Sequence, residues 1–388
     1  MVIIGRAAIA DALLNLFIAL SMLSIYRYTV RPDPALLRRI FFWIGLGVLT
    51  KGPVALLIPV VVSFAWYALA RDLKSWFRVA FRPLPWLILL GVVLPWYVLE
   101  YLDQGQAFID GFFLKHNLNR FSSTMEGHGG RLYYYLPVLL FIFMPYTGLF
   151  GLLLGKAKNA LSDPLDRFMW LWFGFVLVFF SFSGTQLPHY LLYGATPIFI
   201  LMARYRSGLT SGLLAYLPVI IFYGLLLFLP EILTMAVAHS DNLYIRSAAD
   251  GIDAAMGMQY RLWIGFTLVL ACLLLLAARR RILPWQGLQM LGIVQVFVIV
   301  YALLPAFARL QQEPVRHAAL KARSLDIPVV MWQIRMPSFT VYRGAITPER
   351  APQAGDLVFT RIDKLAHLGK HRIVFKEGGF VLAKMSPP

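Results

Sequence analysis

The sequence predicts a mostly α-helical membrane protein, with a polytopic transmembrane bundle of about ten segments followed by a small α+β domain. Hydrophobic residues make up 59% of the 388 residues and the mean hydropathy is +0.69, which leaves too little polar surface for a soluble protein. The apolar residues form long blocks, such as 168–182 and 262–278, close to the roughly 20 residues that cross a bilayer. From Ala306 onward charged residues become frequent. We therefore expect a transmembrane domain over 1–305 and a soluble domain over 306–388.

The predicted membrane segments share length and apolar composition, and they occupy 7–26, 40–50, 54–69, 83–101, 132–154, 168–183, 190–203, 213–229, 262–278 and 285–304. Several are shorter than a full span. Tilted and re-entrant paths therefore stay open, especially around Lys51.

The charge distribution predicts the orientation of these segments. The net charge of +17 would suggest a nucleic-acid partner in a soluble protein, but in a membrane protein the position of Lys and Arg matters more. One alternate set of loops holds sixteen basic residues and the other set holds seven. We expect the richer set to be cytoplasmic and the C-terminal domain to lie outside, with no nucleic-acid partner.

The soluble region is predicted to contain one helix and five short strands. The helix covers 313–324, and the strands cover 327–334, 338–343, 356–361, 372–376 and 380–384. Gly355 and the pair Gly378-Gly379 mark turns. The single cysteine, Cys272, lies in an apolar block, so no disulfide framework is expected.

Two ionisable residues inside or next to apolar segments are candidate functional groups, because such residues are costly there. Asp11 lies near the start of the first segment, five positions after Arg6. It is either functional or an interfacial residue that reaches toward water. Lys51 interrupts two apolar segments within Thr50-Lys51-Gly52-Pro53. It either holds a phosphate as a point charge or belongs to a simple turn between two helices.

Two further clusters fall in connections on the outer side. The first mixes cations, amides and imidazoles beside aromatic residues, and it holds Lys115, His116, Asn117, Arg120, Glu126 and His128. It indicates a phosphate or lipid-headgroup site, with a solvated loop as the alternative, and its histidine spacing is not specific for a metal. The second is the short turn that contains Gln186, His189 and Tyr190, which by spacing alone is a helical hairpin turn.

Taken together, these motifs resemble the bacterial membrane glycosyltransferases of the GT-C superfamily, in the branch of the lipid A aminoarabinose transferases and protein O-mannosyltransferases. The resemblance implies a hexosyl- or pentosyl-type transferase in the bacterial inner membrane with a periplasmic C-terminal domain. Its implied partners are a polyprenyl-phosphate-linked sugar and an acceptor on the periplasmic side, either a lipid A-type glycolipid or a protein.

The resemblance also implies roles for individual residues. Asp11 would be an acidic helper near the catalytic carboxylate. The donor phosphate would be bound by Arg120, Lys51, Arg6 and Lys115. The donor and acceptor would further contact Asn117, Glu126, Gln186, His189 and Tyr190. A divalent metal ion is allowed, with His116 and His128 as its ligands. Many relatives carry Lys where this chain has Gln186, which puts one phosphate contact in doubt.

The family begins with a helix and a long acidic outer loop that have no counterpart in this chain. The resemblance therefore predicts an N-terminally truncated transferase that is inactive by itself. A non-catalytic protein that binds a lipid-linked sugar is the alternative. A transporter ranks last, because the candidate charges cluster at one face and no internal repeat is present.

Overall fold

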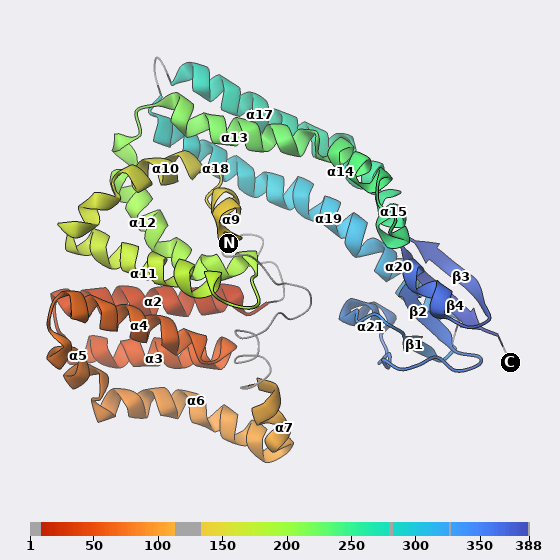
Figure 1. Cartoon of the computed structure of the whole chain (residues 1–388), viewed down its shortest axis with the longest axis horizontal. Helices are drawn as coiled ribbons and strands as arrows, with labels where there is room; N and C mark the ends of the chain where they lie inside the picture. Colours follow the sequence, from red (N-terminus) through yellow and green to blue (C-terminus); the bar gives the residue numbers. More distant parts are fainter. Residues whose placement is uncertain (1–8, 113–132, 279–281, 326, 387–388) are drawn as a thin grey trace. The chain divides into compact units, whose positions relative to one another are not determined.

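The computed structural model describes residues 9–112, 133–278, 282–325 and 327–386 (Figure 1). It divides into two compact units, which are 1–215 with 281–288, and 216–280 with 289–388. The predicted domain boundary at 305/306 stays a prediction.

The helices of the first unit include every predicted segment up to residue 203. They are α2 (Asp11–Val30), α3 (Pro34–Lys51), α4 (Val54–Leu69), α5 (Leu73–Ala80), α6 (Pro83–Gln104), α7 (Gln106–Phe108), α9 (Tyr135–Ile142), α10 (Thr147–Gly155), η2 (Ala157–Leu161), α11 (Pro164–Ser181), η3 (Pro188–Gly194), α12 (Ala195–Tyr205) and η4 (Arg206–Gly208). Helix α2 packs against α3 and α4, α3 packs against α6, and α11 packs against α4, α12 and η3. Figure 1 shows α2, α3 and α6 as neighbouring rows.

The remaining helices are α13 (Gly212–Leu227), α14 (Leu229–Ala238), α15 (Leu243–Ala249), α16 (Ile252–Ala255), α17 (Met258–Ala277), α18 (Pro284–Val298), η5 (Ile299–Leu303), α19 (Leu304–Gln311) and α20 (Glu313–Ser324). Among the described residues, five helical stretches are long and apolar enough to cross a membrane, and two bent helix pairs raise the total to as many as seven. All ten predicted segments fall on helices, and the predicted fold class is confirmed.

Some predicted segments are not continuous α-helices: 190–203 divides into the 3₁₀ helix η3 and α12, and 132–154 is broken in its middle. The segment 132–154 contains α9 and α10, whose axes are bent by 118°. The break falls at Met144-Pro145, where proline lacks the N–H that a continuous helix needs.

A four-stranded sheet follows α20 in the second unit. Its strands β1 (Val329–Met331), β2 (Leu357–Arg361), β3 (His371–Glu377) and β4 (Phe380–Met385) lie in the order β1-β2-β4-β3. Strands β1 and β2 are parallel, while β4 is antiparallel to β2 and β3. Helix α20 packs against β3 and β4, and its Val315 and Ala318 are fully buried with Phe359 and Phe380 of the sheet.

The predicted strand 338–343 is also wrong, because these residues form the crossover helix α21 (Pro337–Arg343) between β1 and β2. Pro337 suits the first turn of a helix, and Gly344, with a φ of 75°, ends it in the left-handed region. Only Phe339 of this segment is buried, and its ring stacks on Phe359 with centroids 4.0 Å apart. The predicted strands 356–361, 372–376 and 380–384 and the glycine turns are confirmed, whereas of 327–334 only Val329–Met331 is strand.

Candidate active site

Asp11 and Lys51 meet at one end of the first unit. Asp11 is the first residue of α2 and Lys51 is the last residue of α3, and the two helices pack as an antiparallel pair. The Lys51 Nζ atom lies 2.5 Å from the Asp11 Oδ1 atom. Asp11 is 4% exposed, whereas the Lys51 side chain is 25% exposed. The carboxylate is therefore buried behind the ammonium group, which still reaches the surface.

The backbone around Lys51 explains this placement. Gly52 follows with a φ of 86°, a conformation that favours glycine, and its N–H donates to the Val48 carbonyl over 2.7 Å. Pro53 cannot continue the hydrogen-bond ladder of α3, and α4 starts at Val54. The predicted break is thus a tight helical hairpin turn with the lysine at its tip.

Tyr193 and His189, both from η3, complete the cluster. The Tyr193 hydroxyl donates to Asp11 Oδ1, and Lys51 Nζ donates to the same hydroxyl over 3.2 Å. The His189 Nε2 atom lies 3.6 Å from Asp11 Oδ1. The same Asp11 carboxylate oxygen is thus close to an ammonium, a phenol and an imidazole. Their contacts with this oxygen hold the three side chains around one position.

An aromatic wall supports the cluster. The Lys51 Nζ atom lies 5.2 Å from the centre of the Tyr190 ring, within the range of a cation–π contact. The rings of Tyr190 and Tyr193 stack at 6.3 Å, and Phe180 of α11 packs against both. The Trp172 indole donates to the Tyr193 carbonyl over 2.8 Å. These contacts fix the tyrosines and, through them, the lysine.

Sequence reasoning missed Tyr193. The motif that drew attention ended at Tyr190, and the residues after it were assigned to a membrane helix. In a 3₁₀ helix, residues three apart lie on the same face, which places Tyr193 directly beyond Tyr190. Pro188 at the start of the segment was the local signal for such a turn.

Gln186 lies beside this cluster rather than in it. It is 3% exposed, and its amide nitrogen donates to the Ser181 carbonyl over 2.8 Å. Its Oε1 atom is buried and accepts no hydrogen bond from any residue that the structure describes. The structure thus brings together four predicted site residues, Asp11, Lys51, His189 and Tyr190, and buries Gln186 nearby.

Seven predicted site residues lie outside the described residues, namely Arg6, Lys115, His116, Asn117, Arg120, Glu126 and His128. Across the described ranges, no group of three or more His, Cys, Asp or Glu side chains could hold a metal ion. The metal ion and its two histidine ligands stay a prediction.

The fold and this cluster define a class of protein: a multi-pass membrane bundle with an acid–lysine–tyrosine site at the helix ends and a small C-terminal sheet domain.

A family model described as dolichyl-phosphate-mannose-protein mannosyltransferase matches residues 1–106, which include Asp11 and Lys51. The undecaprenyl phosphate-α-4-amino-4-deoxy-L-arabinose arabinosyl transferase of Photorhabdus laumondii is 27% identical over 259 residues, covering 63% of this chain and 46% of that protein. The enzyme of the same name from Edwardsiella ictaluri is 34% identical over 168 residues, covering 43% of this chain and 30% of its own length.

Solved structures show the same fold. The crystal structure of ArnT from Cupriavidus metallidurans bound to undecaprenyl phosphate superposes with a TM-score of 0.71 at 17% identity, covering 98% of this chain and 76% of that one. Its apo state gives a TM-score of 0.68 at 18% identity, covering 97% of this chain and 75% of that one. The resemblance to GT-C polyprenyl-phosphate-sugar glycosyltransferases is thereby confirmed. The chain spans less than half of the length of the two curated relatives.

Proposed function

We propose that this chain carries the donor site of a membrane glycosyltransferase, which moves a sugar from a polyprenyl-phosphate donor to an acceptor at the membrane face where α2 begins. One observation supports it above the others: the Lys51 ammonium is oriented by a buried carboxylate and a phenol, in the region that the family model matches. A lone lysine in a hairpin turn would need no such support.

The chemistry of sugar transfer fits this cluster. The acceptor oxygen attacks the anomeric carbon, the bond from that carbon to the phosphate oxygen breaks, and negative charge develops on the departing phosphate. A fixed cation lowers the energy of that charge. The Lys51 ammonium donates to the Asp11 carboxylate and to the Tyr193 hydroxyl, and these two contacts fix its position. Lys51 would bind the phosphate, and Asp11 and Tyr193 would position Lys51.

The role of the acidic helper is also proposed for Asp11. The His189 side chain, 22% exposed, lies close enough to exchange a hydrogen bond with a ligand that enters the cluster, and the contact of Tyr190 with donor or acceptor is proposed with it. The other proposed phosphate ligands are Arg120, Arg6 and Lys115. The acceptor proton is removed by a base that the described residues do not identify.

The names of the relatives suggest the first donor to test. Undecaprenyl phosphate-α-4-amino-4-deoxy-L-arabinose is the donor in the names of both curated relatives, and a lipid A-type glycolipid is the acceptor that we propose with it. The positive-inside bias supports an inner-membrane location with the sheet domain in the periplasm.

A transfer assay tests the proposal. Membranes that contain the protein are supplied with the aminoarabinose donor and lipid A, and the product is measured by mass spectrometry. The predicted truncation implies no product from this chain alone, so the assay is run beside a version extended upstream. In the extended version we expect product with the wild-type sequence and with Lys370→Ala, a control in an exposed turn of the sheet domain, and a loss of at least about ten-fold with Lys51→Ala. Undiminished transfer by Lys51→Ala would remove the lysine from the site. Donor binding without transfer by this chain and by the extended version alike would favour the non-catalytic sugar-lipid-binding protein.

A further inference from the structure

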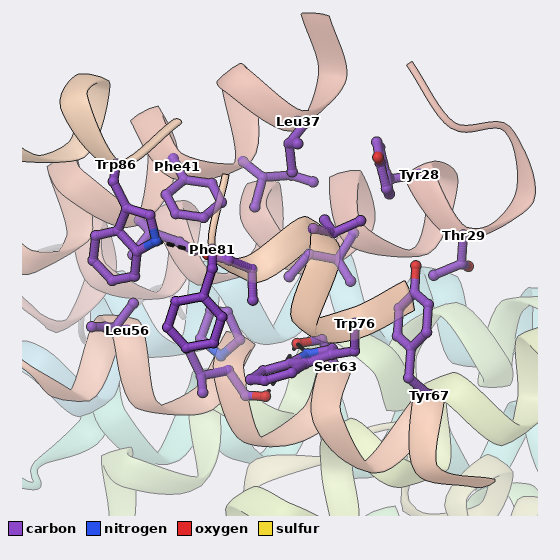
Figure 2. Close-up of a pocket in the computed structure, with 17 residues that line it drawn as sticks. Tyr28, Thr29, Leu37, Phe41, Leu56, Ser63, Tyr67, Trp76, Phe81 and Trp86 are labelled. Carbon is purple, nitrogen blue, oxygen red and sulfur yellow. Dashed lines mark hydrogen bonds between the residues drawn. The ribbon is translucent and has the colours of Figure 1, made fainter. Parts of the chain in front are cut away.

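A pocket lies among the helices that carry the candidate site, and it opens toward the ends of α2 and α3 that lie away from Asp11 and Lys51. It has a volume of 310 Å³ and is lined by residues of α2, α3, α4, α5 and α6 (Figure 2). Its lining runs from Ile25, about 20 Å from Asp11 along α2 at 1.5 Å per residue, to Leu56 in the first turn of α4, and it includes no residue of the Asp11, Lys51, His189 and Tyr193 cluster. The two sites are therefore separate.

The lining of the pocket is apolar and aromatic. The Trp76 indole donates to Ser63 Oγ over 3.0 Å, and the Trp86 indole donates to the Ala80 carbonyl over 2.7 Å, as the dashed lines in Figure 2 show. Both indole N–H groups are thus satisfied by the protein, and the rings present carbon to the cavity. Phe81 lines the pocket and is still 69% exposed, so it stands at the mouth. Such a cavity accepts a hydrocarbon chain.

The two ends of the pocket differ. In Figure 2, Tyr28, Thr29 and Tyr67 gather at one end with their oxygen atoms, while Phe81 and Trp86 lie at the other. This gradient matches a lipid whose ester region lies near hydroxyl groups and whose chain lies among rings.

Basic residues surround this end of the helices. Eight exposed cations are found here, namely Arg27, Arg31, Arg38, Arg39, Arg71, Lys74, Arg78 and Arg82. None of them forms an ion pair with a residue in the described part of the chain. Among the acidic residues at this end, Asp33 and Asp72 accept hydrogen bonds from the first turns of α3 and α5, and Asp163 and Asp166 are paired with Arg204. The surface around the mouth is strongly positive.

Helix α5 joins the pocket to this surface. Trp76, Val79 and Ala80 line the cavity, while Lys74 and Arg78 are exposed on the other face. A short amphipathic helix of this kind lies in the membrane interface, where its cations attract anionic headgroups.

We propose that this pocket binds an acyl chain of an anionic phospholipid, such as phosphatidylglycerol, from the leaflet opposite the candidate active site, with the headgroup held by Lys74 and Arg78. The tail of the polyprenyl donor explains the pocket less well, because its phosphate would lie at the Asp11 end and would leave the cations at this end without an anion.

The experiment uses the full chain, purified in mild detergent and studied by native mass spectrometry with phosphatidylglycerol or phosphatidylcholine added. We expect wild type to retain phosphatidylglycerol preferentially. Val60→Trp fills the pocket and should abolish that retention. Val98→Trp makes the same change at a position on α6 that is 49% exposed and lies outside the pocket, and it should leave retention intact.

The charge variants test the contact with the lipid headgroup separately from the contact with the acyl chain, and they leave the protein core unchanged. Lys74→Glu/Arg78→Glu should lower retention of phosphatidylglycerol by at least about ten-fold while sparing phosphatidylcholine. Lys370→Glu/Arg372→Glu, an equal charge change on exposed residues of the sheet domain, should have no effect. Equal retention by the two tryptophan variants, equal retention of the two phospholipids by wild type, or a polyprenyl phosphate in place of phospholipid would each overturn the proposal. None of these outcomes depends on transferase activity.

Discussion

At the residue scale, the ion pair between Asp11 and Lys51 couples stability to the proposed binding of donor. Asp11→Asn leaves Lys51 without its carboxylate partner, so we expect the free energy of unfolding to fall by about 2 kcal/mol. This loss is smaller than that for a fully buried ion pair, because the Lys51 side chain reaches solvent. The double variant Asp11→Asn/Lys51→Met removes both charges and should regain most of the stability. Thermal unfolding in detergent measures both. Independent, additive losses in the double variant would show that the two groups do not interact.

Tyr193 offers a milder test of the same cluster. Tyr193→Phe keeps the ring that packs on Phe180 and Tyr190 but removes the hydroxyl that bonds both Asp11 and Lys51. We expect weaker donor binding with little change in the unfolding temperature, because the aromatic packing stays. Tyr190→Phe, which keeps its ring face toward Lys51, is the matched control and should bind donor normally. A large drop in the unfolding temperature with Tyr193→Phe would assign the hydroxyl to folding instead.

A third residue-scale prediction concerns the sheet domain. Burial raises the pKa of Asp356, but hydrogen bonds from Arg350 and from the Gln353 N–H lower that pKa by a larger amount. The net pKa therefore lies below 3.8. A carboxyl whose pKa is lowered by folding stabilises the fold at pH values above its unfolded pKa, and that contribution is lost as the pH falls through the lowered value. Local stability should therefore decline below about pH 4.

Hydrogen exchange of the peptide that spans Gly355–Arg361, corrected for the intrinsic rate at each pH, measures this decline. Asp356→Asn should lose protection at neutral pH and show a flatter dependence between pH 5 and pH 3, a window that brackets the reference pKa of about 3.9 for Asp. An unchanged pH profile in the variant would exclude Asp356 as the cause.

At the element scale, one glycine sets how closely two helices approach. A Cβ atom on Gly148 of α10 would lie 2.1 Å from the Leu214 carbonyl oxygen of α13, a backbone atom that cannot move aside alone. Gly148→Ala should therefore cost about 1–3 kcal/mol in stability. Gly151→Ala lies in the same helix with its nearest contact at 3.8 Å, and it should be neutral or slightly stabilising through helix propensity. Equal unfolding temperatures for the two variants would contradict this packing.

The elements also show where sequence patterns succeed. Long apolar blocks such as α17 leave few alternatives to a helix, so they were predicted well. The segment 338–343 alternates polar and apolar residues like a strand, yet Val341 is 75% exposed and only Phe339 enters the core. Pro337 and Gly344, the helix start and stop, decided the outcome. Over so short a stretch, the residues that start and stop a helix outweighed the alternation of polar and apolar residues.

At the scale of the whole molecule, membrane character and the C-terminal α+β domain followed from composition alone. The candidate site did so only in part. Asp11, Lys51 and His189 are separated by long stretches of sequence. Only the packing of α2, α3 and η3 reveals that Lys51 and His189 both approach the same carboxylate oxygen of Asp11. Tyr193 was hidden within a segment whose apolar composition indicated an ordinary membrane helix. A contact between distant elements leaves no local pattern to detect.

Two lipid sites on one bundle should act independently. Val60 follows Lys51 by nine positions, which is about 14 Å at 1.5 Å per residue, so we expect Val60→Trp to leave the binding of polyprenyl phosphate unchanged. Lys51→Ala should in turn leave the retention of phosphatidylglycerol unchanged.

The central claim is that Lys51 binds the phosphate of a polyprenyl donor, and the most direct measurement is the affinity of the chain for undecaprenyl phosphate in lipid nanodiscs. Lys51→Ala should weaken binding by about ten- to one hundred-fold, the value of a charge-assisted hydrogen bond. Lys51→Arg, which keeps the charge with altered geometry, should recover part of that loss. If Lys51→Ala binds undecaprenyl phosphate as tightly as wild type, the phosphate is held elsewhere and the account is contradicted.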